Sequence, residues 1–370
     1  MGARITGYRP WLDGVRALAI LLVLARHLGL DWASHAGGPG VALFFALSGY
    51  LITGLLLDEH ARGGVNVANF YLRRAARLLP ALLLMLVVTD VWFAVTGRGA
   101  PIKESLSVLF YVKNFRDVIT GGAGVFGQTW SLAVEEHFYL IWPAVLLAMA
   151  ARWRRRRIVA ATLGLAAAAC AWRTALVLLD GTGRWPYVGT IARADALLIG
   201  CAFAVAVRRG LRVSRSCSVL ALVVYGWTVS PLWQPQLMEQ TVGYTIQAVA
   251  CALIVAGLDS AESPIRRLLS VKPIVTIGLL SYGVYLWHIP VLNVMPMSNG
   301  WLRDVVVVAV SFALAALSYW AVEQPLRRWA STLGQAKNAL ADDVPLDLRR
   351  AAVERRRERV VPLEGERAVS

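Results

Sequence analysis

Residues 40–57 read GVALFFALSGYLITGLLL, a run without a single charged side chain. A helix needs about 20 mostly apolar residues to cross a bilayer, so this run predicts a membrane span. Similar runs recur along all 370 residues, of which 57% are hydrophobic and 16% charged, whereas soluble domains are about 45–50% apolar and 25% charged. The sequence therefore predicts an all-α, polytopic membrane helix bundle. Its ten predicted spans are residues 11–30, 40–57, 78–96, 130–150, 158–179, 190–207, 216–233, 241–258, 274–296 and 303–322.

The basic residues test this count of spans, because cytoplasmic loops carry an excess of Lys and Arg. Arginine clusters fall between alternate spans, at residues 73–77, 152–157, 208–215 and 266–272, whereas the short intervening loops carry only Arg184. Both termini are therefore predicted to be cytoplasmic, in a multi-pass protein of the cell membrane. The formal net charge of +15 is spread over span ends rather than over one folded basic face, which argues against a nucleic-acid partner.

The membrane region is predicted to form one domain over residues 1–325. The remaining residues, 326–370, are charged and contain few large apolar side chains, so a disordered cytoplasmic tail is expected. The four cysteines, at positions 170, 201, 217 and 251, show neither CxxC spacing nor a histidine at metal-ligand distance. Neither a disulfide framework nor a metal site is expected.

Ionisable residues inside the predicted spans indicate a functional site, because a charge at bilayer depth costs at least about 2.5–3.5 kcal/mol. Arg16 and His27 are spaced so that they share one face of a helix, about 16 Å apart along its axis. Asp13 lies on the same face, so simple neutralisation by Asp13 is an alternative explanation of Arg16. His27 has no charged partner on its own face of this helix.

Further polar residues fall at a similar depth on other spans. Ser48 and Gly49 form a small pair, for which close helix packing is the alternative to a functional role. Adjacent residues point about 100° apart on a helix, so one of Glu135 and Glu136 is expected to face the bundle interior. An imidazole near carboxylates suits proton transfer at a hydroxyl. Proton-coupled carriers use the same residue types, so these residues leave an enzyme and a carrier both open.

Seven segments of the membrane region combine polar and small residues in distinctive order. They are LDGVRA (12–17) with His27, FFALSGYLI (44–52), FYLRRAARLLP (70–80), TWSLAVEEHFYLIWP (129–143), RADALLIG (193–200), LSYGVYLWHIP (280–290) and EQPL (323–326). Together they resemble motifs of the acyltransferase-3 family of integral membrane O-acyltransferases. The resemblance implies transfer of an acyl group from acyl-CoA to a hydroxyl of a sugar-bearing acceptor. The acceptor would be a surface glycan or a glycosylated natural product such as a macrolide.

The resemblance also implies where the reaction takes place. It puts the family's Arg and His pair on Arg16 and His27. The family's SLxxExxFY motif puts its carboxylate on Glu135 or Glu136, and the Glu that precedes Gln-Phe-Tyr matches Glu136, with His137 in place of the Gln. Some members carry an extracytoplasmic hydrolase-like domain, which this sequence does not show, so a small or simple acceptor is expected.

From this resemblance we derive a hypothetical mechanism. His27, oriented by Glu136, takes the proton of the acceptor hydroxyl as that hydroxyl attacks the thioester. Arg16 binds phosphate or pantetheine oxygens of CoA, a co-substrate, and no bound cofactor is expected. An acyl-enzyme on Ser48 or Ser131 is the alternative to direct transfer, although neither serine lies in a GxSxG elbow.

The other candidates are assigned to substrate binding. Arg193 and Asp195 either shape the acceptor pocket or form a buried pair, and His288 lines the pocket or is hydrogen-bonded. The substrate-binding set is Arg16, Ser48, Arg73, Arg77, Glu135, Arg193, Asp195, Tyr282 and His288. The rival function is a carrier of a lipid-linked glycan or acyl group that forms no bond. An inverted repeat would be expected of a carrier, and none is apparent in the sequence.

Overall fold

The structure, a computed structural model, describes residues 8–62, 64–230, 232, 236–295 and 300–326. These residues form helices and no strand, which confirms the all-α prediction. Short 3-10 turns lie at Asp31–Ala33 and Gly127–Thr129, and π-helical turns at Glu239–Gly243 and Tyr319–Glu323. The α-helices are α1 (Pro10–His27), α2 (Gly37–Ala61), α3 (Val67–Val95), α4 (Ile102–Leu109), α5 (Lys113–Thr120), α6 (Trp130–Arg152), α7 (Arg155–Asp180), α8 (Arg184–Val188), α9 (Thr190–Val207), α10 (Arg215–Val229), α11 (Gln236–Met238), α12 (Tyr244–Ser260), α13 (Pro264–Leu269), α14 (Lys272–Val294) and α15 (Trp301–Ser318).

Eight segments of the described chain are long and apolar enough to span a membrane, and they contain α2, α3, α6, α7, α9, α12, α14 and α15. The chain is therefore a multi-pass membrane protein. The two other predicted spans correspond to α1, which carries Asp13, Arg16 and Arg26, and to α10, which has 15 residues. The count of ten spans and the cytoplasmic placement of both termini stay predictions. Apart from Leu326, the predicted tail lies outside the described residues.

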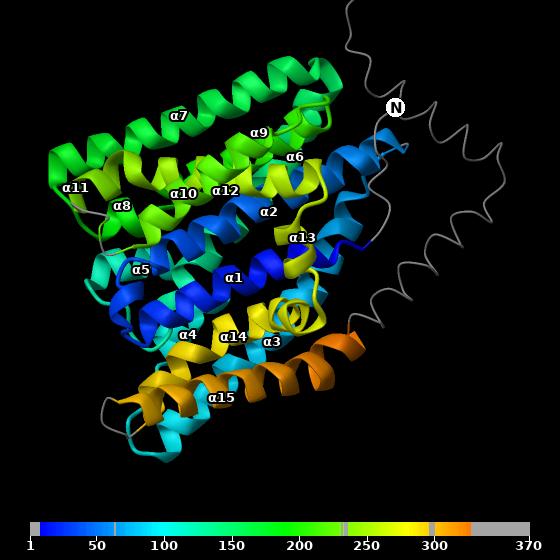
Figure 1. Cartoon of the computed structure of the whole chain (residues 1–370). Coiled ribbons are helices and arrows are strands. Elements are labelled where there is room, and N and C mark those ends of the chain that lie inside the picture. Colours follow the sequence, from blue (N-terminus) through cyan, green and yellow to red (C-terminus); the bar gives the residue numbers. More distant parts are fainter. Residues whose placement is uncertain (1–7, 63, 231, 233–235, 296–299, 327–370) are drawn as a thin grey trace, which may run out of the picture.

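The long helices run roughly along one axis, from right to left in Figure 1. Contacts between helix ends show which ends lie together. Arg9, before α1, bonds Asp259 near the end of α12, and Arg208, after α9, bonds Asp58 near the end of α2. We call this end of the bundle, on the right of Figure 1, the arginine-rich end. The short helices α5, α8 and α11 lie at the opposite end.

Helix α3 begins well before the predicted span 78–96. The side chain of Asn66 accepts a hydrogen bond from the backbone N–H of Asn69 at 2.9 Å, and so caps the helix. Arg73 and Arg77, one turn apart, are consequently helical and share one side of α3. The first turns of α3 therefore hold Arg73 and Arg77 in fixed relative positions at the arginine-rich end.

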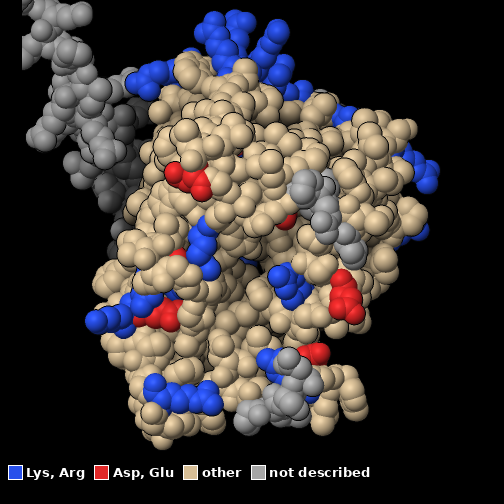
Figure 2. Space-filling view, turned by 90° about the vertical axis from the view of Figure 1, so that its left-hand side faces the viewer, with Lys and Arg blue, Asp and Glu red and all other residues tan. Residues whose placement is uncertain are grey.

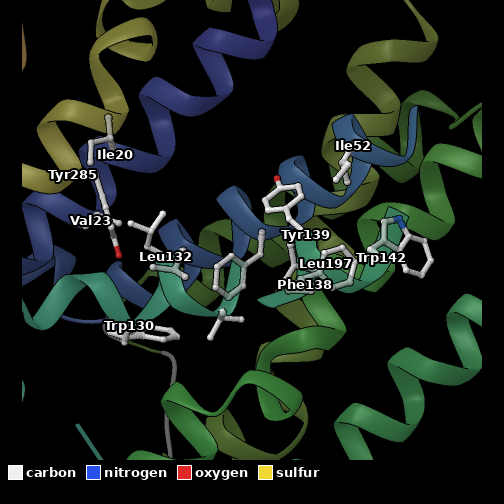
Figure 3. Packing of buried hydrophobic residues seen from close by; sticks show 14 of the residues in the cluster. Ile20, Val23, Ile52, Trp130, Leu132, Phe138, Tyr139, Trp142, Leu197 and Tyr285 are labelled. Carbon is white, nitrogen blue, oxygen red and sulfur yellow. The ribbon is translucent and has the colours of Figure 1, made fainter. Parts of the chain in front are cut away.

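The core is rich in aromatic side chains from α6. Figure 3 shows Trp130, Phe138 and Trp142 along this helix, packed among apolar residues of neighbouring helices. The Trp142 indole N–H donates to the hydroxyl of Thr53 on α2 at 2.8 Å. Packing of α6 against α2 fixes the depth of the polar residues that α6 carries.

Helices α2 and α9 meet at two glycines. A Cβ on Gly49 would lie 2.0 Å from the backbone oxygen of Leu197, and a Cβ on Gly200 would lie 2.1 Å from that of Ala46. Only glycine fits such a close approach of two backbones. Gly49 therefore has the packing role, whereas its neighbour Ser48 faces a cavity described below.

Gly49→Ala should lower the thermal midpoint of the detergent-solubilised protein, because a methyl group there forces the backbones of α2 and α9 apart. Overpacking of this kind costs about 1–3 kcal/mol. Gly164→Ala is the matched control, since a Cβ on this α7 glycine meets no atom within 4 Å. This control should leave the midpoint unchanged or raise it, as Ala favours helix by up to about 1 kcal/mol over Gly. Equal shifts in the two variants would contradict the tight contact.

Candidate active site

A large cavity lies at the end of the bundle opposite the arginine-rich end. Its volume is about 880 Å³, which is in the range of small-molecule sites. Figure 2 views this end and shows charged side chains of both signs around a hollow. We call it the histidine cavity, because His27 lines it. Its other polar and aromatic lining residues are Arg26, Ser34, His35, Gln128, Trp130, Arg184, Tyr187, Gln236, Glu239, Gln240, Tyr244, Tyr285 and Asn293.

His27, the last residue of α1, lies beside a second histidine. Its Nδ1 is 2.9 Å from the backbone oxygen of Val23 and 3.3 Å from Nε2 of His288. His288 lies on α14 and is 1% exposed. Its Nδ1 is 3.1 Å from the backbone oxygen of Val284. The structure thus brings together two histidines that come from separate sequence motifs.

One wall of the histidine cavity is the segment 123–128, which a buried charged cluster holds in place. Glu104 accepts hydrogen bonds from two backbone N–H groups of this segment, at 3.2 and 2.9 Å. Lys113 forms ion pairs with Glu104 and Asp117 and donates to the backbone oxygen of Ala123 at 2.7 Å. Burial raises the pKa of the Asp117 carboxyl, and the ion pair with Lys113 opposes that rise. These charges stabilise the wall.

A second cavity, of about 130 Å³, lies between α2, α3, α6 and α14. Ser48 and Glu135 meet in this central cavity, where the hydroxyl of Ser48 donates to the Glu135 carboxylate at 2.8 Å. Arg16 lines the same cavity and also pairs with Asp13. Arg16 is therefore both neutralised by Asp13 and part of the cavity wall, so the two explanations of Arg16 do not exclude each other.

A third space, which we call the arginine groove, lies toward the arginine-rich end and measures about 380 Å³. Its basic lining residues are Arg16, Arg73, Arg74 and Arg77. Arg73 also pairs with Glu59 at 3.0 Å, and its side chain is 48% exposed. The groove is therefore accessible from the surface.

Shared lining residues connect the three spaces. Arg16 and Ser48 line both the arginine groove and the central cavity, and Val41 and Tyr285 line both the central cavity and the histidine cavity. The Tyr285 hydroxyl bonds the side chain of Ser131 and the backbone oxygen of Gln128, which fixes the ring at this junction. A row of cavities thus runs from the arginine-rich end to His27.

Residues 9–322 match the acyltransferase-3 family model, whose description is an acyltransferase domain. The chain belongs to the acyltransferase-3 family. Curated relatives include the peptidoglycan O-acetyltransferase OatA of Listeria monocytogenes, 34% identical over 355 residues, and the putative peptidoglycan O-acetyltransferase YrhL of Bacillus subtilis, 33% identical over 358 residues. The O-acetyltransferase OatA of Staphylococcus aureus is 27% identical over 350 residues.

These alignments cover most of the acyltransferase-3 chain but only part of its relatives. They include 87%, 86% and 87% of this chain and 56%, 55% and 57% of the Listeria, Bacillus and Staphylococcus proteins. The chain therefore spans a little over half the length of these relatives. No solved structure matches it.

The two glutamates of the acyltransferase-3 motif on α6 have different partners. Glu135 faces the central cavity, as expected for one of the pair, while Glu136 forms an ion pair with Arg74. Among the described residues no hydrogen bond joins either carboxylate to His27. In the structure the Glu136 carboxylate is paired with Arg74. That Glu136 orients His27 therefore stays a prediction.

His137, which replaces the family's Gln, lies away from the histidine cavity. Its Nδ1 is 2.9 Å from the hydroxyl of Thr190, and its ring stacks on Phe115. The side chain lines an apolar groove of about 540 Å³ between α6, α7 and α9. His137 therefore joins α6 to α5 and α9.

Arg193 and Asp195 are both buried in the acyltransferase-3 bundle, but each has its own environment. The Asp195 carboxylate pairs with Arg173 at 2.9 Å. Arg193 is 1% exposed, and none of its three side-chain nitrogens has a hydrogen-bond partner among the described residues. Its guanidinium carbon lies 3.8 Å from the ring centroid of Tyr244 and 6.0 Å from that of Trp130. Both rings line the histidine cavity, whereas Arg193 does not. Arg193 therefore stabilises this aromatic wall through cation–π contacts on the side away from the cavity.

Arg173 on α7 was missed as a candidate from the sequence. It is 0% exposed, and it donates hydrogen bonds to backbone oxygens of Ala192, Gln240 and Thr241 as well as to Asp195. Two of these oxygens belong to the π-helical turn Glu239–Gly243, a form that often occurs at functional sites. The available signal was an arginine in the middle of an otherwise uncharged run.

The remaining candidate, Tyr282, lines the central cavity and donates its hydroxyl to the backbone oxygen of Leu78 at 2.9 Å. It therefore joins α14 to α3 beside the arginine groove. Among the described residues, no group of His, Cys, Asp and Glu side chains has an arrangement that could hold a metal ion.

Proposed function

We propose that this chain transfers a short acyl group from acyl-CoA to a hydroxyl of a sugar-bearing acceptor. The observation that carries the proposal is the row of cavities from the arginine groove to His27. A donor bound at one end and an acceptor bound at the other would meet near the junction at Tyr285. The positive-inside rule predicts that the arginine-rich end is cytoplasmic, which is the side on which acyl-CoA is found.

The arginine groove supports binding of the donor. Arg16, Arg73 and Arg77 line it, and guanidinium groups bind phosphate oxygens through paired hydrogen bonds. The acyl end of the thioester would extend into the central cavity, which Ser48 and Glu135 line. The phosphates of CoA would stay in the groove.

At His27 the reaction balances without a further reactant. Nε2 of His27 takes the proton of the acceptor hydroxyl as the hydroxyl oxygen attacks the thioester carbonyl carbon. The C–S bond breaks, an ester forms, and the thiolate leaves as CoA thiol with the proton that His27 held. We favour this direct transfer over an acyl-enzyme, because neither Ser48 nor Ser131 lies in a GxSxG elbow.

The histidine cavity supports binding of a glycan or glycoside. Trp130, Tyr187 and Tyr244 line it together with polar groups such as Gln240 and Asn293, and ligand sites combine apolar walls with a few polar groups that fix orientation. The Listeria relative is named a peptidoglycan O-acetyltransferase and the Bacillus relative a putative one, which favours a surface glycan as acceptor. A glycosylated natural product such as a macrolide is the second acceptor class.

The test is CoA release by the purified chain in proteoliposomes. Acetyl-, propionyl- and longer acyl-CoA would be supplied with peptidoglycan fragments, other oligosaccharides and a glycosylated macrolide, and the products identified by mass. Release that depends on the acceptor and yields an ester supports the proposal. Absence of release with every donor, combined with passage of a labelled lipid-linked glycan across the vesicle wall, would establish the carrier instead.

Arg73→Gln should raise the KM for acyl-CoA about tenfold and leave kcat within about twofold, because it removes a phosphate contact that persists throughout the reaction. Arg152→Gln is a control at the same end of the bundle, at the end of α6 and outside the groove. The control should leave the KM unchanged. An unchanged KM in Arg73→Gln would remove Arg73 from the donor site.

A further inference from the structure

We propose that His288 is a positioning residue, which fixes the tautomer of His27 so that Nε2 of His27 is the unprotonated nitrogen. The inference rests on the proposed function, in which His27 is the base. It concerns one question, namely which of the two ring nitrogens of His27 carries the proton. Neighbouring hydrogen-bond partners decide this for any neutral histidine.

The first step is the tautomer of His288. Its Nδ1 lies 3.1 Å from the backbone oxygen of Val284. A carbonyl oxygen only accepts, so Nδ1 must carry the hydrogen that joins the two atoms. A neutral imidazole has one N–H, so Nε2 of His288 is left as an acceptor.

The second step is the tautomer of His27. Its Nδ1 lies 2.9 Å from the backbone oxygen of Val23 and 3.3 Å from Nε2 of His288. Both neighbours are acceptors, so Nδ1 of His27 must carry the hydrogen. Nε2, on the far side of the ring, then holds a free lone pair.

The opposite assignment leaves contacts without a hydrogen. If Nε2 of His27 carried the proton, the lone pair of Nδ1 would face the Val23 oxygen at 2.9 Å. Nε2 of His288 would then have to donate to Nδ1 of His27. If His288 is neutral, the lone pair of its Nδ1 would face the Val284 oxygen; if both of its nitrogens carry hydrogens, the buried ring would be a cation. Only the first assignment satisfies all three contacts of the histidine pair.

The positions of the two rings divide their roles. His27 lines the histidine cavity, whereas the buried His288 does not and so acts through His27. The other titratable groups that line this cavity are Arg26, His35, Arg184, Tyr187, Glu239, Tyr244 and Tyr285. None of them has a hydrogen bond to His27 among the described residues. His288 is therefore the side chain that can select the tautomer.

Two variants of His288 separate positioning from simple structural support. His288→Leu removes the side-chain acceptor of Nδ1 of His27 and leaves only the Val23 oxygen. It should lower kcat about tenfold to a hundredfold with the KM for acyl-CoA within about twofold, because a shift toward the wrong tautomer is costly in catalysis by histidine. In His288→Gln the amide oxygen can accept from Nδ1 of His27, so kcat should recover to within about fivefold of wild type. His60→Leu, an exposed histidine near the end of α2, should change neither constant by more than about twofold.

A direct measurement keeps the proposal testable if His288→Leu folds poorly. The chain contains five histidines, so ¹⁵N shifts of ring-labelled protein can be assigned by single replacements. Wild-type His27 should show an unprotonated Nε2. A protonated Nε2 in the wild type would overturn the proposal, as would equal loss of kcat in the Leu and Gln variants at unchanged thermal midpoint. Wild-type CoA release would still support the proposed function in either case.

Discussion

A His27→Ala chain is expected to lose acceptor-dependent CoA release by a hundredfold or more, the largest effect on activity of any single change in this protein. General-base catalysis contributes about 10²–10⁴-fold to a rate, and His27 offers an imidazole on the wall of the histidine cavity, at one end of the row of cavities. The loss should appear in kcat and in kcat/KM alike, because the proton transfer occurs only in the transition state. Release of CoA by purified protein in proteoliposomes measures it.

His35→Ala is the control for this experiment, since His35 lies in the loop between α1 and α2 and lines the same cavity. It should retain at least about a third of the wild-type rate. A His27→Ala protein that keeps its rate would remove His27 as the base, while ester formation would still identify the chain as a transferase.

Arg173→Met should destabilise the fold by about 3–5 kcal/mol, the largest effect expected on stability. The change keeps an unbranched apolar stem but leaves the Asp195 carboxylate buried without its ion pair, and breaking a buried pair on one side costs this much. It also leaves the carbonyl oxygens of Gln240 and Thr241 without their donor. Unfolding by SDS in mixed micelles measures the free energy.

A second variant shows whether the orphaned carboxylate causes this loss. Arg173→Met combined with Asp195→Leu should recover part of the stability, because no unpaired charge remains. Arg156→Met, at the exposed start of the same helix, should change the free energy of unfolding by less than about 0.5 kcal/mol. A loss in Arg156→Met as large as that in Arg173→Met would show that the effect does not come from the buried pair.

The helices were predictable because their signal is large. Runs of apolar residues appear at every long helix, and the span 190–207 coincides with α9. The start of α3 was not predictable from hydropathy, since Arg73, Arg74 and Arg77 interrupt the apolar run and the start is marked by the Asn66 cap. Hydropathy locates the part of a helix that lies in lipid, whereas caps locate its ends.

The site was predictable only in part, for a similar reason. Helical spacing places Arg16 and His27 on one face, and the structure puts both on walls of the connected cavities. Spacing along one helix cannot say which other helix faces it, so the partners of Glu136, Asp195 and His288 came only from the structure. Arg193 and Asp195, two positions apart, point to different neighbours for the same reason.

The junction at Tyr285 and Val41 has an electrical consequence. The groove at one end reaches the surface at Arg73, and the cavity at the other end reaches it at Asn293, so the septum between the two openings lies around Val41 and Tyr285. The voltage of an energised membrane would fall largely across this septum, where a moving unit charge exchanges about 2.3 kcal/mol per 100 mV. An acyl group is neutral. Its passage past Tyr285 would neither draw on that voltage nor work against it, and the rate of transfer would be the same in energised and de-energised cells.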